Sequence, residues 1–155
     1  MTDDLAIRRR RLLGWGWRLA PVTPHADLGL DLVLDSVEGD STRLAEVSAA
    51  DCVVQDLTVA LTTTLGSSLF NSALGFDGLN ALAFETDPVM QRERIRLAVI
   101  GVLQREARIA RIDAVDVSYG DRASRQLRVD ANFTLIDGSS AAVSTTPLWG
   151  LDVNA

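Results

Sequence analysis

The chain has 155 residues, of which 47% are hydrophobic and 23% are charged, a balance that is ordinary for one globular domain with its own core. Its formal net charge is −6, so the composition implies no general affinity for nucleic acid. All 15 cationic residues are arginine, a side chain suited to bidentate pairing with carboxylates. The single cysteine, Cys52, excludes an internal disulfide and a cysteine-based metal cluster.

Residues 1–26 are predicted to form an N-terminal arm. Four arginines at positions 8–11 precede Trp15 and Trp17, which one glycine separates. Because glycines disfavour a stable amphipathic helix, we expect this arm to be extended. Its anchors on this protein or on a partner would be Trp15, Trp17 and Arg18. A membrane-surface segment or a nucleic-acid tail is the alternative interpretation of the arginine run.

Residues 27–35 carry leucine at every even position, which predicts a half-buried strand with its leucines inward. The three aspartates on its outer face lack the loop pattern of a calcium site and are interpreted as solvated carboxylates. A helix is predicted over residues 51–65. Ser48 and Asp51 form its start signal, and Gly66 stands where a C-terminal cap is expected. Cys52, near the helix start, is expected to be a structural thiol.

A second helix is predicted over residues 88–105. Asp87 can cap it, and Pro88 suits the first helical position, where a missing N–H costs nothing. Apolar residues recur at helical spacing, with most arginines on the other side. The apolar positions are Ile95, Val99, Val102 and Leu103. The helix is expected to end near Glu106, after which apolar residues from 112 to 117 indicate a β-strand.

Residues 127–135 alternate between apolar and polar side chains, and the Asp137-Gly138 pair that follows is a strong hairpin signal. We therefore expect an α+β fold, with a small antiparallel sheet of three to four strands and two main helices packed on one face. Residues 27–145 would form a single domain, and residues 146–155 would form a C-terminal tail.

Three motifs of this chain resemble those of one family, in the same order. Glu106-Ala107-Arg108-Ile109 is similar to a Glu-Pro-Arg-Ile signature between a long helix and a strand, and the Leu-Gly-x-Gly-Trp string at residues 13–17 resembles the N-terminal segment. A central motif is kept at Gln55, Thr63, Gly66, Phe70, Asn71 and Gly75, with departures at Ser67, Ser68 and Ser72. The family comprises the baseplate wedge proteins that initiate the sheath in contractile phages, type VI secretion and extracellular contractile injection systems.

The resemblance implies a structural baseplate component in which Glu106 and Arg108 dock on the helical core bundle of the wedge. One edge of the sheet would resemble that of a sheath subunit and initiate sheath assembly. The residues assigned to this edge are Leu127, Arg128, Val129, Asp130, Ala131 and Phe133. The implied partners are other baseplate wedge proteins and the sheath subunit, with spike, hub or tube-initiator proteins as further candidates. The family also implies six copies per baseplate.

The implied location is the bacterial cytoplasm during assembly and then the baseplate of the particle. We expect no small-molecule substrate, nucleic acid or membrane among the partners of this component. The alternative function is a small adaptor that binds nucleic acid or membrane through the arginine-rich arm.

Catalysis is not expected, although the family was once associated with lysozyme activity. A glycosidase needs two carboxyl groups that flank a cleft, whereas Glu85 and Asp87 are interpreted as residues of a helix start. The sequence has one histidine, no phosphate loop and no nucleophile elbow. Neither a metal nor a cofactor is expected.

Overall fold

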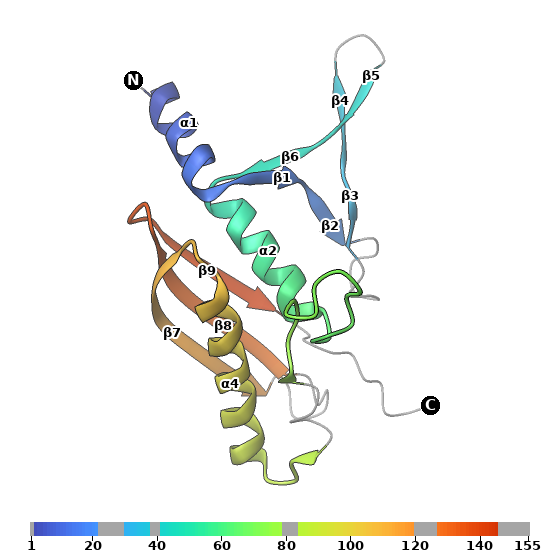
Figure 1. Ribbon diagram of the computed structural model, residues 1–155, viewed down its shortest axis with the longest axis vertical. Helices are drawn as coiled ribbons and strands as arrows, with labels where there is room; N and C mark the ends of the chain where they lie inside the picture. The colour runs from blue at the N-terminus through green and yellow to red at the C-terminus, as the bar shows by residue number, and fades with distance from the viewer. Residues whose placement is uncertain (1, 22–29, 38–40, 79–83, 120–126, 146–155) are drawn as a thin grey trace. The chain divides into compact units, whose positions relative to one another are not determined.

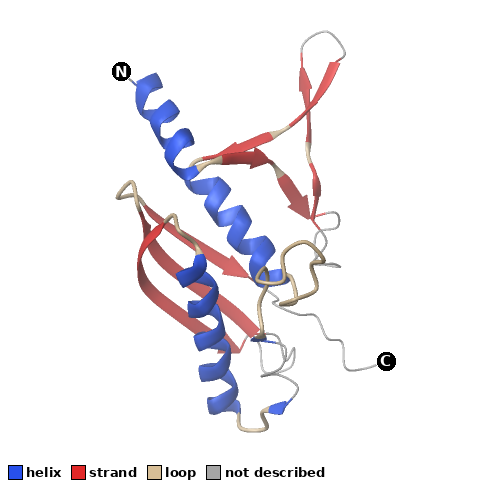
Figure 2. Cartoon of the chain, viewed as in Figure 1, coloured by secondary structure: helices blue, strands red, loops and turns tan. Residues whose placement is uncertain are grey.

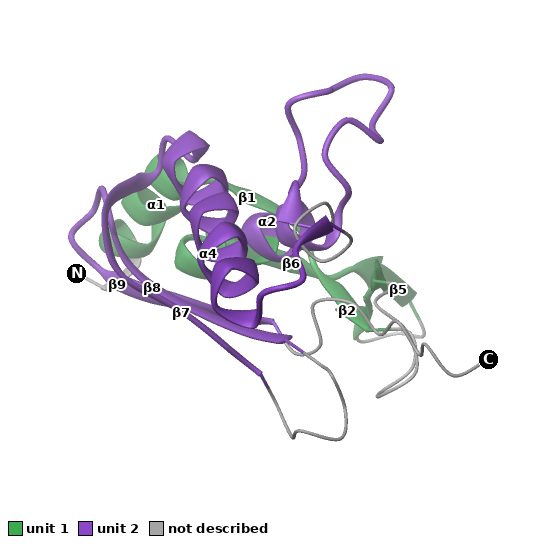
Figure 3. Cartoon of the chain, turned by 90° about the horizontal axis from the view of Figure 1, so that it is seen from below, with its two compact units in different colours: residues 1–55 green, residues 56–155 purple. Residues whose placement is uncertain are grey.

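The computed structural model describes residues 2–21, 30–37, 41–78, 84–119 and 127–145 (Figure 1). Within these residues the fold is α+β, with three helices and small antiparallel sheets (Figure 2). The chain forms two compact units, Met1–Gln55 and Asp56–Ala155, which are coloured separately in Figure 3. The boundary between the units falls inside helix α2 (Ala50–Thr62).

The first unit consists of a helix followed by short strands. Its elements are α1 (Thr2–Leu13), β1 (Trp15–Trp17), β2 (Leu19–Pro21), β3 (Leu30–Leu32), β4 (Leu34–Val37), β5 (Ser41–Leu44), β6 (Glu46–Ser48) and the first part of α2. The strands form three antiparallel pairs, β1 with β6, β2 with β3, and β4 with β5. These strands follow one another in three extended segments, residues 15–21, 30–37 and 41–48. Each segment pairs with one of the other two in its first half and with the remaining one in its second half.

The change of partner occurs at a closed ring of three backbone hydrogen bonds. The Arg18 N–H donates to the Ala45 carbonyl (2.8 Å), and the Ala45 N–H donates to the Val33 carbonyl (2.8 Å). The Val33 N–H closes the ring by donating to the Arg18 carbonyl (3.0 Å). Each of the three residues thus donates once and accepts once, so the backbone groups of the ring satisfy one another at the point where the ladders end.

The expected extended arm is wrong for most of its first half, because Thr2–Leu13 form helix α1. The helix ends directly before Gly14, whose φ of 90° is a left-handed conformation that suits glycine and stops a helix. The chain then becomes extended in β1, as expected for the tryptophan segment. The glycines therefore end a helix that forms before them, and they do not prevent it.

The single half-buried strand expected over residues 27–35 is also wrong within the described part of that segment. It is divided at Val33 into β3 and β4, and the Leu32 and Leu34 side chains are 49% and 63% exposed, whereas Asp35 is half-buried. A two-stranded ribbon has no second layer of its own to create a buried face, so period-two alternation does not decide which side is covered. Asp27 lies outside the described residues.

The second unit is built around one antiparallel sheet of three strands in the order β7-β8-β9. Its elements are the last part of α2, α4 (Pro88–Arg105), β7 (Ile109–Tyr119), β8 (Leu127–Leu135) and β9 (Ser140–Thr145). Helix α4 packs against β7. The four apolar positions predicted to face inward on α4 are all buried, and the Asp87 carboxylate caps it by accepting from the N–H groups of Val89 (2.7 Å) and Met90 (3.1 Å).

The alternation predicted for residues 127–135 is confirmed by the core. Leu127, Val129, Ala131, Phe133 and Leu135 are each at most 3% exposed. The hairpin signal is confirmed too, because a turn at residues 136–138 joins β8 to β9. The strand predicted from residue 112 is longer than expected and begins directly after the helix–strand junction, at Ile109.

The open sheet edge assigned to Leu127, Arg128, Val129, Asp130, Ala131 and Phe133 is wrong, because these residues belong to the central strand. Strand β8 pairs with β7 over its whole length and with β9 on the other side over residues 129–134. Both sides of its backbone are therefore occupied over residues 129–134, and no further strand can be added there. The edges of this sheet are the outer sides of β7 and β9.

A loop over residues 63–76 follows α2 and returns to its own start. The Phe76 N–H donates to the Thr63 carbonyl (2.9 Å), and the Leu65 N–H donates to the Phe76 carbonyl (3.2 Å). Gly75 has a φ of +115°, and a Cβ at this position would lie 2.8 Å from backbone atoms of Leu65 and Thr63. Only glycine fits this closure of the loop.

We expect Gly75→Ala to destabilise the second unit more than Gly66→Ala does. Gly66 also has a positive φ (+79°), but nothing lies within 4 Å of the place that a Cβ would occupy there. Gly66→Ala should therefore cost only the left-handed conformation, about 1–2 kcal/mol. The overlap at Gly75 should add about 1–3 kcal/mol. Urea unfolding of the two variants measures the difference, and equal losses of stability would contradict the tight closure.

Candidate functional site

The step from α4 to β7 is short, and several backbone hydrogen bonds hold it. Glu106 is the C-terminal cap of α4, with extended backbone angles (φ −82°, ψ 107°). Its N–H donates to the Leu103 carbonyl (3.2 Å), and its carbonyl accepts from the Ile109 N–H (3.1 Å). The Arg108 carbonyl accepts from the Ile136 N–H (3.0 Å), which joins the junction to the hairpin turn beyond β8. The backbone of the Glu-x-Arg motif is thus fixed on both sides.

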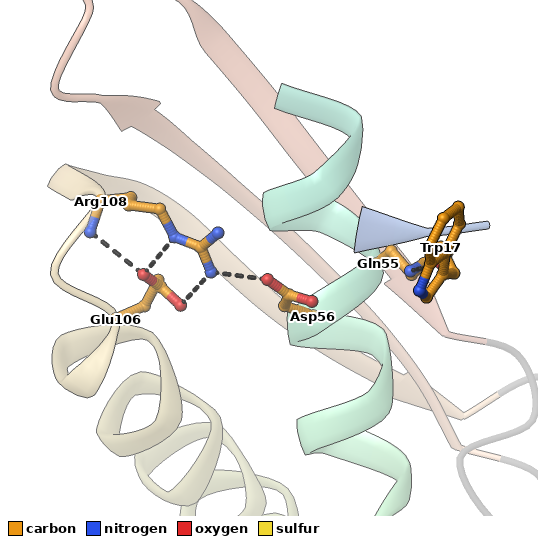
Figure 4. Close-up of polar contacts among 5 residues, drawn as sticks. All are labelled: Trp17, Gln55, Asp56, Glu106 and Arg108. Carbon is orange, nitrogen blue, oxygen red and sulfur yellow. Dashed lines mark hydrogen bonds and ion pairs between the residues drawn. The ribbon is translucent and has the colours of Figure 1, made fainter. Parts of the chain in front are cut away.

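The side chains of the motif pair with each other and with α2 (Figure 4). Arg108 donates to both carboxylate oxygens of Glu106, from Nε to Oε1 (2.7 Å) and from Nη2 to Oε2 (2.8 Å). The Arg108 backbone N–H donates to the same Oε1 (3.1 Å). Nη2 also donates to Oδ2 of Asp56 on α2 (2.8 Å). One guanidinium therefore holds two carboxylates that lie far apart in the sequence.

Both members of the motif are largely covered, since the side chains of Arg108 and Glu106 are 22% and 19% exposed. The hydrogen bonds from Arg108 hold the pKa of the Glu106 carboxyl below its usual value, against the opposing effect of partial burial. In the same way, the hydrogen bond to Glu106 raises the pKa of the Arg108 guanidinium. Both groups are therefore charged in the folded protein at neutral pH.

A groove of about 310 Å³ opens beside this ion-pair cluster, within the second unit. It is lined by Asp56, Leu57 and Ala60 of α2, by Val102, Arg105 and Glu106 of α4 and its cap, and by Asn71, Ala73, Leu74 and Gly75 of the loop. The loop is attached to α4 through Arg105, whose Nη1 donates to the Ala73 carbonyl (2.8 Å). Apolar side chains form much of this lining, and its charged members are Asp56, Arg105 and Glu106.

The groove brings together residues that belong to separate motifs of the sequence. Asn71 and Gly75 come from the central motif, Glu106 from the junction motif, and Asp56 directly follows Gln55. The aromatic residue of the central motif, Phe70, does not take part in the core, because its side chain is fully exposed.

Two further residues of the central motif act within the chain. The Gln55 side chain donates to the Trp17 carbonyl (2.9 Å; Figure 4). It also accepts from the Leu19 N–H (2.8 Å), so one amide bonds to the backbone on both sides of Arg18. The Thr63 hydroxyl donates to the Val59 carbonyl at the end of α2 (2.7 Å). Gln55 and Thr63 therefore each have a structural role within the chain.

The predicted arm anchors lie in the first unit. Trp15 and Trp17 are about half exposed and contact each other edge to face, with ring centroids 5.7 Å apart. The Arg10 guanidinium lies 4.8 Å from the Trp15 ring centroid and pairs with Glu46 (2.8 Å). Arg18 has an exposed side chain, and its backbone belongs to the hydrogen-bonded ring. Trp15 is therefore anchored within the chain.

Other candidate residues have structural explanations. Asp87 is the cap of α4, and Glu85 pairs with Arg94 (3.6 Å). Cys52 is buried, as expected for a structural thiol. Within the described residues, no group of three or more His, Cys, Asp or Glu side chains could hold a metal ion. No helix in the described ranges is long and apolar enough to cross a membrane. His25 lies outside the described residues.

Sequence reasoning gave no site role to two charged residues of the groove, Asp56 and Arg105. Asp56 has no predicted role, although an acidic residue next to Gln55 could have been paired with one of the fifteen arginines. Arg105 was assigned only to the charged side of α4. Neither role follows from spacing along the chain, because both depend on contacts between α2, the loop and the junction.

We expect Glu106→Gln to lose stability at neutral pH and to lose little at acidic pH. The charged hydrogen bonds to Arg108 should stabilise the fold by about 1.5–3 kcal/mol at pH 7. Because the pKa of Glu106 is lowered by folding, this stabilisation is complete above the unfolded-state pKa of about 4.3, and disappears as the pH falls through the lower folded-state value.

Urea unfolding at pH 7 and about pH 3 measures this dependence. Glu93→Gln is the matched control, because Glu93 is exposed on α4 in an i,i+3 pair with Arg96 and should contribute only about 0.3–0.5 kcal/mol. A Glu106→Gln penalty that is the same at both pH values would contradict the ionic pairing.

The family resemblance described above rests on the motif residues of this chain. What the structure adds is their arrangement, since residues from the central and junction motifs line one groove. Comparison with protein-family models finds no match for the chain, and comparison with curated proteins finds none either.

Proposed function

We propose that this protein is a structural component of a contractile-tail baseplate, which docks on the core bundle of the wedge and initiates sheath assembly. The observation that carries the proposal is the convergence of three motif residues, from two separate motifs, on one groove. Asn71, Gly75 and Glu106 are separated by up to 35 positions in the sequence (106 − 71), yet they line the same surface of the second unit. Motifs with purely local roles need not converge in this way.

The shape and chemistry of the groove suit a helix of a partner. Its lining includes the apolar residues Leu57 and Ala60 on α2 and Val102 on α4, together with the charged residues Asp56, Arg105 and Glu106. A helix can place a row of apolar side chains in such a groove and contact a charged residue with a polar one. The core bundle of the wedge is helical in the family that this chain resembles.

In this proposal the Glu-x-Arg motif fixes the positions of two residues that line the groove, Glu106 and Asp56. Arg108 is engaged by Glu106 and Asp56, whereas Glu106 itself lines the groove. The motif thus connects α2 to the α4–β7 junction and also offers one carboxylate to the partner. The packing of α2 beside α4 on one face of the three-stranded sheet, the arrangement expected from the sequence, belongs to the same proposal.

We expect Ala60→Trp to exclude the protein from baseplates while leaving it folded. Ala60 lines the groove, is half-buried and takes no part in the ion-pair cluster. An indole at this position would therefore fill the groove. Leu97→Trp is the control, because Leu97 is 65% exposed on α4 and does not line the groove. Particles are purified from cells that produce each variant, and the protein they contain is measured by immunoblot. Incorporation of Ala60→Trp at the level of Leu97→Trp would contradict docking through the groove.

The sheath-initiating edge in this proposal is the outer side of β9, which replaces the β8 residues expected from the sequence. The Leu135 N–H donates to the Ser139 carbonyl (2.8 Å), so these two residues face each other through their backbone groups. Hydrogen-bonded pairs alternate along an antiparallel ladder, so the backbone groups of Ala141 and Val143 also point to β8. The backbone groups of Ser140 and Ala142 then point away from the sheet. Strand β9 has no charged residue, no proline and no register shift, so the strand itself carries none of the charges, prolines or bulges that often protect an edge.

The other edge, on β7, is protected in several ways. Its pairing with β8 has two register shifts, and it carries Arg111, Asp113 and Asp116. The Arg96 side chain of α4 donates from Nε to the Val115 carbonyl (3.2 Å), which occupies part of the backbone. Bulges and charges of this kind oppose the addition of a strand. The sheet therefore has one edge that is suited to β-augmentation, on β9.

We expect Ala142→Pro to give baseplates and tubes that lack sheath. Ala142 is exposed, and its N–H points to the outer side of β9, so proline removes an edge donor without breaking the β8–β9 ladder. Ala142→Thr is the control that retains the donor. Electron microscopy of the assembled particles counts those with sheath, after circular dichroism has shown that both variants fold. Full-length sheaths on particles that contain Ala142→Pro would overturn this assignment of the edge.

A further inference from the structure

The groove contains a cation that the chain does not neutralise within the described residues. Arg105 donates from Nε to the Gly101 carbonyl (3.0 Å) and from Nη1 to the Ala73 carbonyl (2.8 Å). Both acceptors are uncharged, and no carboxylate of the described residues lies within ion-pair distance of Arg105. Nearby Arg108, in contrast, is held between two carboxylates.

The two backbone contacts fix the Arg105 guanidinium in place. A guanidinium has five N–H donors in a rigid plane, so the two that are used leave others for a ligand. The side chain is exposed and lines the groove, and its bonds to one helical carbonyl and one loop carbonyl fix the direction of the remaining donors. Less side-chain entropy is therefore lost when Arg105 binds an anion.

The surroundings limit which anion can bind. Leu57 and Val102 line the groove but are almost fully buried, whereas Ala60 and Leu74 are half-buried. The apolar surface of Ala60 and Leu74 favours an apolar segment over a strongly hydrated one. The carboxylates of Asp56 and Glu106 also line the groove, and they would repel a chain of phosphates. The loop over residues 63–76 has no charged side chain and presents Leu69 and Phe70 fully exposed. A single carboxylate on an otherwise apolar polypeptide satisfies all of these conditions.

We propose that the groove binds a partner polypeptide that places apolar side chains on Ala60 and Leu74 and one carboxylate on Arg105. This inference rests on the proposed docking function and specifies the chemistry of the partner at that site. The carboxylate forms charge-assisted hydrogen bonds with the unused donors of Arg105. The partner is thus recognised by one acidic residue within an apolar helical face.

The test begins with a photocrosslinking residue at Ser72, which lies between the groove-lining residues Asn71 and Ala73. Purified particles are irradiated, and the crosslinked partner peptide is identified by mass spectrometry. That peptide should contain an Asp, a Glu or a chain terminus among apolar residues. A crosslinked segment with no carboxylate would overturn the proposal.

The identified partner protein is then used in binding measurements with the full chain. Arg105→Glu should weaken binding at least about 30-fold, the effect expected when one member of a close charge pair is lost. Reversing the partner carboxylate to arginine should weaken binding to the wild-type chain and restore binding to Arg105→Glu. Because Arg105 also holds the loop, this restoration separates loss of a charge pair from loss of loop structure. Failure of every carboxylate reversal in the peptide to restore binding would overturn the proposal.

Two control variants complete the series. Arg94→Glu reverses a charge on the same helix outside the groove and should bind normally. Arg105→Lys keeps the charge without the planar fork and should bind with intermediate affinity. Unchanged affinity in Arg105→Glu would refute the inference even if the protein is a baseplate component. A reciprocal charge reversal with a partner that belongs to no contractile particle would support the inference and refute the proposed function.

Discussion

The second unit depends on one guanidinium placed between two carboxylates. Arg108 fixes the helix cap at Glu106 and, across 52 positions of sequence, the middle of α2 at Asp56. The contact crosses a long stretch of chain, so its formation must offset a substantial loss of chain entropy. An arginine can do this because its planar fork bonds both carboxylates at once, whereas the single ammonium of a lysine could not reproduce the bidentate geometry.

The groove is a consequence of this contact and of the closed loop beside it. The ion pairs keep α2 next to the end of α4. The Arg105 bond to Ala73 holds the loop, which is the third segment that lines the groove. Gly75 permits the loop to return close enough for this bond, since any side chain there would meet the backbone of Leu65. The same residues that fold the unit thus define the surface proposed for docking.

What could be predicted from the sequence was local. The Asp87 cap, the buried positions of α4 and the alternation of β8 depend on residues within one element, and all were predicted correctly. The errors concern partners that are distant in sequence. Alternation in residues 127–135 is the same for a central strand as for an edge strand, so it could not show that β8 pairs on both sides. The ring at Val33 and the Asp56–Arg108 pair are likewise invisible to spacing.

The departures from the family motifs can now be weighed against the structure. Glu106 has the extended backbone that a residue before proline adopts, and Ala107 is exposed, so alanine at this position keeps the geometry of the family's Glu-Pro-Arg sequence. The serines at positions 67 and 68 differ in kind, because they stand where the family that the chain resembles has a Glu-Arg pair, in a loop that carries no charge here. The backbone of the proposed docking site is therefore compatible with these departures, while its electrostatics differ from the family pattern. With no charged side chain in the loop, Arg105 is left as the cation that a partner carboxylate can recognise.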